Sequence, residues 1–252
     1  MRLPKRLDLV LKQDQSKERA SDQGEASPDA APLAGLAPRW HTLLLVCLIV
    51  AVFVSGSLLA GSESSRPSPA SRTTAVYLPL LLVEWGLLFY VARIGRGHSA
   101  LRDLLGKSWN SARRALTDLA LAAVVFAQIQ GVELLARLWL GSASNPARDA
   151  LLPVSAREWA IYGFVAVSAG FCEELVYRGY LLVQLGAFTG SIGLGCVLQA
   201  ALFGLAHAEQ GAAVALRFAL YAGLLGGLAV WRRTLIPGIV AHVALDLAAG
   251  LR

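Results

Sequence analysis

Apolar residues along this chain are gathered into long runs, and short polar segments separate one run from the next. A run of about 18 or more apolar residues is typical of a transmembrane helix, because a helix of that length crosses the hydrocarbon core of a bilayer. We find about seven such runs, at residues 41–61, 75–92, 117–140, 158–185, 191–207, 212–230 and 235–250. The pattern predicts an all-α fold, a polytopic transmembrane helical bundle of about seven spans.

The segments outside these runs have compositions of their own. Residues 95–116 mix leucines with arginines, a lysine and Trp109, which is typical of a helix lying along the membrane interface. Residues 62–74 are rich in Ser and Pro, so we expect a loop there. Residues 1–39 are polar and lack the apolar stretch of a cleavable signal, and we predict a disordered cytoplasmic tail.

These features divide the chain into three parts. We expect a tail over residues 1–39, N-terminal transmembrane helices with the interfacial segment over 40–150, and a further domain of four spans over 151–252.

The composition agrees with an integral membrane protein. The chain is 56% hydrophobic and 16% charged, with a mean hydropathy of +0.55, whereas a soluble domain carries about a quarter charged residues. The net charge of +6 does not indicate a nucleic-acid partner, because no aromatic-flanked basic stripe is present. The three cysteines, Cys47, Cys172 and Cys196, all fall inside apolar runs, where we expect core packing rather than a disulfide or a metal site.

The distribution of Lys and Arg predicts the orientation in the membrane. With the N-terminus in the cytoplasm, the inside segments hold fifteen of these residues and the outside segments five. Positive residues are enriched on the cytoplasmic side. We therefore expect a multi-pass protein of the cell membrane with its N-terminus cytoplasmic and its C-terminus outside.

Ionisable residues inside the predicted spans are candidates for function, because each costs about 2.5–3.5 kcal/mol at the centre of a membrane helix. They are Glu84, Glu133, Arg137, Glu173, Glu174, Arg178, Arg217 and Asp246. Glu133 and Arg137 are four residues apart, so we expect a structural ion pair between them. Arg217 is near a helix end and can extend toward Glu209. No role is assigned to Glu84.

The segment from Glu173 to Arg178 combines two adjacent carboxylates with a cation. Arg178 follows Glu174 by four residues, so the two side chains share a helix face and can pair. Glu173 points elsewhere and has no obvious cation on its own helix. An unpaired carboxylate in an apolar environment can exchange a proton near neutral pH, as a general base must. The alternative is a buried polar cluster that only fixes the packing of helices.

Histidines follow in the next spans. His207 comes four residues after Phe203, and His242 comes four residues before Asp246. Taken singly, His207 could be a hydrogen bond between helices, and His242 with Asp246 could be a structural pair. Their occurrence after the two glutamates, on successive membrane helices, favours a common site.

The ordered set Glu173-Glu174-x-x-x-Arg178, Phe203-x-x-x-His207 and His242-x-x-x-Asp246 resembles the CPBP family of intramembrane proteases, over about residues 151–252. That family includes the type II CAAX prenyl endopeptidases and bacterial relatives linked to bacteriocin self-immunity. The resemblance implies a glutamate-dependent intramembrane endopeptidase, so the third domain would be its peptidase domain.

The resemblance also implies roles for the individual residues. Glu173 would activate a water molecule, and His207 would hold or share its proton. His242 and Asp246 would stabilise the oxyanion. Members of the family frequently carry Asn at the position of Asp246. Because an ionised Asp would repel an oxyanion, we expect Asp246 either to be protonated or, as we prefer, to orient His242.

A second set of residues would support the catalytic ones without reacting. By the same resemblance it consists of Glu174, Arg178 and Phe203.

No cofactor is expected. Zinc held by Glu173, His207 and His242 is an alternative mechanism, although the HExxH pattern of many zinc peptidases is missing. The partners implied are the lipid bilayer and a membrane-associated or hydrophobic-ended peptide. A prenylated CAAX protein is the substrate of the best-known relatives, but no residue here identifies a prenyl pocket.

Two other functions remain open. One is a catalytically silent membrane scaffold or bacteriocin-immunity-type protein that binds a partner. The other is a proton-coupled transporter with Glu173 and His207 as a relay, although no inverted repeat is visible. Counting residues also leaves a question of depth. Glu173 and His207 come out about 26 Å from the turn that connects their helices, and His242 comes out about 12 Å from the turn before its own helix. The depths then disagree unless the fourth span projects from the membrane or bends near Gly179.

Overall fold

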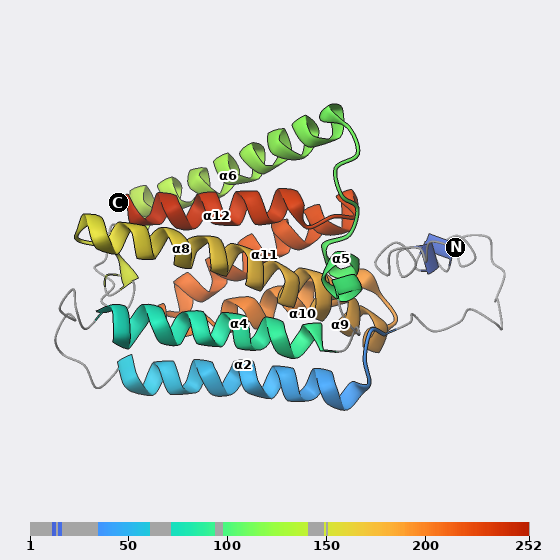
Figure 1. Ribbon diagram of the computed structural model, residues 1–252, viewed down its shortest axis with the longest axis horizontal. Coiled ribbons are helices and arrows are strands. Elements are labelled where there is room, and N and C mark those ends of the chain that lie inside the picture. The colour runs from blue at the N-terminus through green and yellow to red at the C-terminus, as the bar shows by residue number, and fades with distance from the viewer. Residues whose placement is uncertain are drawn as a thin grey trace.

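The fold is a bundle of helices whose axes run mostly along the longest dimension of the molecule (Figure 1). The structure is a computed structural model that describes residues 12–13, 15–16, 35–60, 72–93, 98–140, 149 and 151–251. In these ranges the only β-type pairing is an isolated bridge between Gly106 and Thr234. The all-α, polytopic bundle predicted from the apolar runs is confirmed.

Most of the described residues are helical. The main helices are α2 (Arg39–Ala60), α4 (Leu78–Ala92), α5 (His98–Leu105), α6 (Ala112–Leu140), α8 (Ala156–Glu173), α9 (Leu182–Thr189), α10 (Ile192–Leu205), α11 (Ala212–Arg232) and α12 (Ile236–Gly250). The shorter segments are η1 (Thr73–Tyr77), η2 (Glu174–Leu181) and η3 (Ala208–Gln210). Two of these, η1 and η2, are π-helical, and η3 is a 3-10 turn.

The apolar helices coincide with the predicted runs. Within the part of the chain that the structure describes, four of them are long and apolar enough to cross a membrane, namely 73–92, 112–139, 156–189 and 212–232. Three shorter apolar helices lie at 39–55, 192–205 and 236–250. The predicted interfacial segment contains α5, and α6 begins within it at Ala112. Most of the predicted tail, and the loop at 62–71, lie outside the described residues.

The helices of the C-terminal part lie at the centre of the bundle. Figure 1 shows α2, α4, α8, α12 and α6 in succession across the molecule, with α10 and α11 packed alongside. The closest packing is between α10 and α11, and α8 packs against both α4 and α12. The segment from α8 to η2 is therefore enclosed by other helices, and all eight residues of η2 are buried.

The register between α8–η2 and α12 is fixed by glycines at points of close approach. A Cβ added to Gly170 would lie 3.0 Å from the backbone nitrogen of Val243, and one added to Gly179 would lie 3.1 Å from Leu235 Cδ1. Small residues allow membrane helices to approach closely. Because the helices are antiparallel, Glu174 lies between these two contacts, close to Gly238 and within about one turn of His242 on α12.

This register answers the question of depth. Gly179, and not the turn at Gly190, is level with the start of α12. The helix continues from Gly179 to Thr189, about 15 Å further at 1.5 Å per residue. The fourth predicted span thus projects past the turn between α11 and α12, so the histidine and the glutamates meet although their turns are at different levels.

Two expected pairings are wrong. Glu133 does not pair with Arg137, and its Oε2 lies 3.2 Å from Arg217 Nη1 on α11. Its Oε1 accepts a 2.6 Å hydrogen bond from Tyr221. Arg217 therefore pairs with Glu133 and not with Glu209. Side chains on neighbouring helices offered a closer partner than the next turn of the same helix.

The cysteines differ in their surroundings. Cys172 is buried and Cys196 is half-buried, but Cys47 is exposed on α2. In a membrane helix an apolar side chain can face lipid as readily as protein, so an apolar run does not predict burial in the core.

Candidate active site

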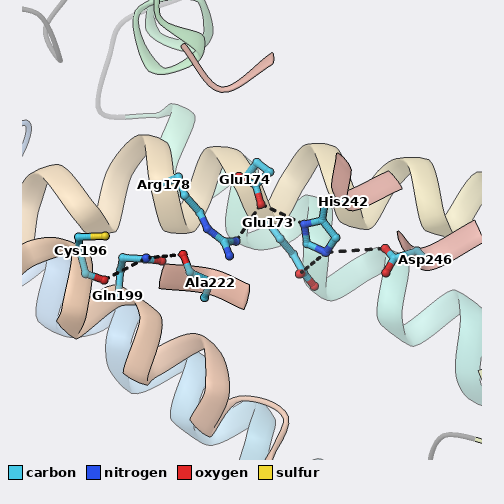
Figure 2. A network of polar contacts seen from close by, with 8 residues as sticks. All are labelled: Glu173, Glu174, Arg178, Cys196, Gln199, Ala222, His242 and Asp246. Atoms are coloured by element: carbon cyan, nitrogen blue, oxygen red, sulfur yellow. Dashed lines mark hydrogen bonds and ion pairs between the residues drawn. The ribbon is translucent and has the colours of Figure 1, made fainter. Parts of the chain in front are cut away.

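The predicted glutamates and His242 meet inside the bundle, as Figure 2 shows. Glu173 is the last residue of α8, and Glu174 and Arg178 belong to η2. His242 and Asp246 lie one turn apart on α12. Segments far apart in the sequence thus supply one polar cluster. Single-turn π-helical stretches occur frequently at functional sites, and here the stretch begins between the two glutamates.

Glu174 is the most engaged member of the cluster. Its Oε1 lies 2.9 Å from Arg178 Nη1 and 3.0 Å from His242 Nδ1, and none of its side chain is exposed. The carboxylate accepts the hydrogen bond from the imidazole, which joins η2 to α12. A Cβ on Gly238 would lie 2.9 Å from Glu174 Oε2, so this glycine leaves room for the carboxylate. Glu174 fixes the position and the ring orientation of His242.

Arg178 is held by charge and by an aromatic face. It forms an ion pair with Glu174 by distance, but its nitrogens make no well-aligned hydrogen bond within the described residues. Its guanidinium carbon lies 4.4 Å from the centre of the Phe203 ring. A guanidinium over an aromatic face is attracted by the ring quadrupole. Phe203, which the sequence placed in the supporting set, therefore contacts the buried cation directly.

The second nitrogen of His242 faces two more carboxylates. Nε2 lies 3.6 Å from Glu173 Oε2 and 3.8 Å from Asp246 Oδ2. Both distances exceed the usual 2.7–3.2 Å range of an N–H···O hydrogen bond. The 3.0 Å contact that orients the ring comes from Glu174, while Asp246 lies on the opposite nitrogen. Asp246 is anchored through its backbone, whose carbonyl accepts a 2.6 Å hydrogen bond from Tyr162.

The exposed fractions separate the two glutamates. The side chain of Glu173 is 22% exposed, that of Asp246 32%, and that of Glu174 is sealed. Glu173 and Asp246 are therefore accessible from outside the bundle, whereas Glu174 is not.

His207 lies just beyond the end of α10, in the turn before η3. Its Nδ1 is 2.8 Å from the carbonyl oxygen of Phe203, which otherwise has no helical partner. A carbonyl only accepts, so Nδ1 carries the hydrogen and Nε2 is left as an acceptor. The ring stacks on Phe218 with centroids 4.2 Å apart.

The described residues show no hydrogen bond or ion pair between His207 and Glu173. The link between His207 and the cluster is instead aromatic. The Phe203 ring lies 4.7 Å from that of His207 and 6.0 Å from that of His242, centroid to centroid. Phe203 thus separates the two histidines and contacts Arg178.

Glu84 is a neighbour of the site to which the sequence gave no role. It is 4% exposed on α4, and neither of its carboxyl oxygens has a hydrogen-bond partner among the described residues. It lies within electrostatic range of Glu173, Asp246 and His242. An isolated carboxylate in an apolar run was the only signal in the sequence, and that signal does not say which helix the side chain faces.

Gln199 is a further buried polar residue beside the site. Its amide nitrogen donates to the carbonyl oxygens of Cys196 and Ala222, each at 3.1 Å, and joins α10 to α11 (Figure 2). The side chain is fully buried.

A metal site does not emerge from the side-chain geometry. Within the described ranges, no group of three or more His, Cys, Asp and Glu side chains is arranged so that it could hold a metal ion. The zinc alternative needs Glu173, His207 and His242 around one point, and these three do not form such a group in the described residues.

The apolar helices of the described residues define an integral, multi-pass membrane protein. Residues 155–248 match the family described as type II CAAX prenyl endopeptidase Rce1-like. The resemblance of this region to the CPBP proteases is thereby confirmed, and the match supports a CAAX-protease-like peptidase at the level of the family. Comparisons with curated proteins and with solved structures gave no match. All the predicted site residues fall within the matched range.

Proposed function

We propose that this protein is an intramembrane glutamic endopeptidase in which Glu173 activates the attacking water. The observation that carries the proposal is the contact of His242 with both glutamates, through Nδ1 to Glu174 and through Nε2 toward Glu173. The match of residues 155–248 to a peptidase family supports a hydrolytic role for this centre.

Glu173 is the better base of the two glutamates on three counts. It is partly exposed, it is not in contact with Arg178, and its nearest cationic group is His242 at 3.6 Å. Glu174 is sealed and already accepts contacts from Arg178 and His242. A general base must reach the proton that it removes, which only Glu173 can do.

We assign His242 to stabilising the oxyanion. Because both ring nitrogens face carboxylate oxygens, the ring is oriented to donate on both sides. Glu174 holds Nδ1, so Nε2 remains for the substrate. One donor aimed at a developing oxyanion contributes about 10²–10³-fold in rate. Asp246, on the Nε2 side, would help to hold the ring or, when protonated, donate as well.

His207 would serve as an acceptor for the attacking water. Its Nδ1 is committed to the Phe203 carbonyl, so Nε2 offers a lone pair. We assign it to holding the attacking water or sharing its proton with Glu173.

The steps balance without a cofactor. Glu173 takes a proton from water as the oxygen forms a bond to the scissile carbonyl carbon, and the oxyanion receives hydrogen bonds from His242. The tetrahedral intermediate then collapses, the C–N bond breaks, and the proton on Glu173 passes to the leaving amine. The products are a carboxylate and an amine.

The substrate that fits this location is a peptide bond at or within the membrane surface. A site enclosed by α8, α10 and α12 favours a membrane-associated or hydrophobic-ended peptide, and the family suggests a prenylated CAAX sequence. We also propose that the chain lies in the cell membrane with its N-terminus cytoplasmic, on the Lys and Arg distribution.

The test uses purified full-length protein in detergent or lipid with a quenched-fluorescent farnesylated CAAX peptide and an unprenylated control peptide. Glu173→Gln keeps the shape and removes the base, so we expect cleavage to fall by at least about 10²-fold. Glu133→Gln is the matched control, because it changes an intramembrane glutamate outside the site. A chelator is added in a parallel arm.

The outcomes separate the candidate mechanisms. Cleavage lost in Glu173→Gln, kept in Glu133→Gln and indifferent to chelator supports the proposal. Cleavage abolished by chelator indicates a metallopeptidase. Cleavage kept in Glu173→Gln contradicts the base assignment. If neither peptide is cut while the protein is folded, a silent scaffold becomes the better description. Flux that depends on a pH gradient, without cleavage, indicates a transporter.

A further inference from the structure

Residues at the start of α6 and the end of α11 line a basic hollow. Figure 1 shows that α6 begins and α11 ends at the end of the bundle where α12 starts. The volume of the hollow is about 630 Å³. The described residues that line it include five cations and no carboxylate. The cations are Lys107, Arg113, Arg114, Arg232 and Arg233. None of the lining residues belongs to the candidate active site.

The walls of the hollow are fixed by a buried carboxylate. Asp118 is fully buried, and its Oδ1 accepts from Arg232 Nε at 2.9 Å while its Oδ2 accepts from Trp109 Nε1 at 2.9 Å. One acid thus joins α6 to the end of α11 and to the loop before α6. The arginine is held in place before any ligand arrives, and a pre-organised donor loses less entropy on binding.

Backbone contacts between Lys107 and Arg233 fix one side of the hollow. Lys107 donates its backbone N–H to the carbonyl of Arg233 at 2.9 Å, next to the bridge between Gly106 and Thr234. Gly106 has φ +78, and a Cβ there would lie 2.6 Å from the Arg233 carbonyl oxygen. Only glycine allows this approach without strain. The loop that carries Lys107 is therefore attached to the turn between α11 and α12.

Two arginines at the start of α6 have no anionic partner among the described residues. Arg113 is exposed, and Arg114 is half-buried with its Nε buried and without a hydrogen-bond partner. The first N–H groups of a helix carry partial positive charge, which adds to the charge of these arginines at the start of α6. Guanidinium groups bind phosphate oxygens in a bidentate manner. The hollow is thus suited to a phosphate group.

The position of the hollow indicates where the phosphate comes from. Trp231, which lines it, is 67% exposed at the end of a membrane helix. Tryptophan is enriched at the headgroup level of a bilayer. If the N-terminus is cytoplasmic, this end of the bundle lies at the cytoplasmic leaflet. Basic pockets between helices on that side bind anionic headgroups.

We propose that the basic hollow binds the phosphate of an anionic phospholipid headgroup. The binding site is formed by Arg113 and Arg114 with Arg232 of α11. It anchors the start of α6 and the turn before α12, the helix that carries His242.

The test uses purified full-length protein in a neutral detergent. Short-chain phosphatidylglycerol or phosphatidylcholine is titrated in, and the midpoint of thermal unfolding is followed as a measure of binding. Wild type is compared with R113Q/R114Q. The matched control is R137Q/R157Q, which also removes two arginines, at the other end of the bundle. R113K/R114K keeps the charge.

We expect phosphatidylglycerol to raise the midpoint of wild type more than phosphatidylcholine does. R113Q/R114Q should bind phosphatidylglycerol about tenfold or more weakly, because each cation near the surface contributes about a factor of five. R137Q/R157Q should match wild type, and R113K/R114K should keep most of the preference. High salt should weaken the effect.

Three results would overturn the proposal. They are an equal response of wild type to both lipids, an equal loss in the two glutamine double variants, and an undiminished preference in R113Q/R114Q. In a separate arm, inorganic phosphate is added alone. If it raises the midpoint at millimolar concentration and phosphatidylglycerol adds nothing, the ligand is a soluble phosphate and not a lipid.

Discussion

The imidazole of His242 donates through Nδ1 to Glu174 Oε1 across 3.0 Å, and this bond joins α12 to the start of the π-helical segment η2. The same carboxylate oxygen lies 2.9 Å from Arg178, so one buried acid contacts both the Arg178 guanidinium and the His242 ring. Glu173, the adjacent residue, is left on the exposed side of the ring. Adjacent residues in the sequence therefore have different surroundings, since Glu174 is fully buried and Glu173 is partly exposed.

Glu174→Gln should destabilise the protein strongly. It leaves Arg178 fully buried without a counter-charge, and breaking a buried pair by removing one partner costs about 3–5 kcal/mol. Thermal unfolding of the purified protein in detergent measures the loss. The double variant Glu174→Gln/Arg178→Met removes both charges and should recover most of the stability, while cleavage stays low because His242 has lost its acceptor. An unfolding midpoint of Glu174→Gln equal to that of wild type would show that the ion pair does not stabilise the fold.

Asp246→Asn should retain cleavage within about tenfold. The amide replaces the hydrogen-bond donor of a protonated Asp246, and it adds a donor if Asp246 is ionised. The site brings Asp246 near Glu173 and Glu174, and an amide removes one carboxylate from a crowded group. It can also donate to an oxyanion, as the Asn frequent in the family would. Asp246→Ala removes the polar group and should reduce cleavage. If Asn is as damaging as Ala in the peptide assay, the carboxylate itself is needed.

Glu84→Met should raise stability by about 1–3 kcal/mol, because a buried polar group without a partner is replaced by an apolar one of similar length. Neither oxygen of Glu84 has a partner among the described residues, and the side chain is 4% exposed. Denaturation in detergent would measure the gain. A clear loss of stability would mean that the Glu84 carboxyl group has a hydrogen-bond partner, either water or a group on the path that the substrate takes. Measuring cleavage by the same variant would distinguish these two cases.

Gly170→Ala should separate α8 from α12. The new Cβ would lie 2.6 Å from Val243 Cγ2 and 3.0 Å from the Val243 backbone nitrogen, next to His242. Overpacking of this kind costs about 1–3 kcal/mol. We expect lower stability and reduced cleavage together. The control is Gly163→Ala on the same helix, where nothing lies within 4 Å of the added Cβ. It should be neutral or slightly stabilising.

If Gly163→Ala and Gly170→Ala lower the unfolding midpoint equally, the effect is not one of helix packing. Val243→Ala, combined with Gly170→Ala, should restore part of the loss because it removes the side chain that the new Cβ meets.

The intramembrane ionisable residues show how far the sequence alone can be used. The cost of burying charge made Glu173 and Glu174 candidates, and the spacing of four correctly paired Glu174 with Arg178. The same spacing wrongly paired Glu133 with Arg137, because Arg217 and Tyr221 on α11 compete for that carboxylate. Helical spacing states which residues share a face and says nothing about what the neighbouring helix offers.

The sequence by itself determined the bundle and its candidate residues, because a bilayer accepts few spanning structures and the apolar runs of this chain are long. Only the tertiary structure decided which glutamate holds His242, that Glu84 lies beside the site, and that five cations from α6, α11 and their loops gather around one hollow. These facts depend on the register between antiparallel helices. Close contacts at Gly170 and Gly179 set that register, and such contacts join positions distant in the chain and leave no periodic signal along it.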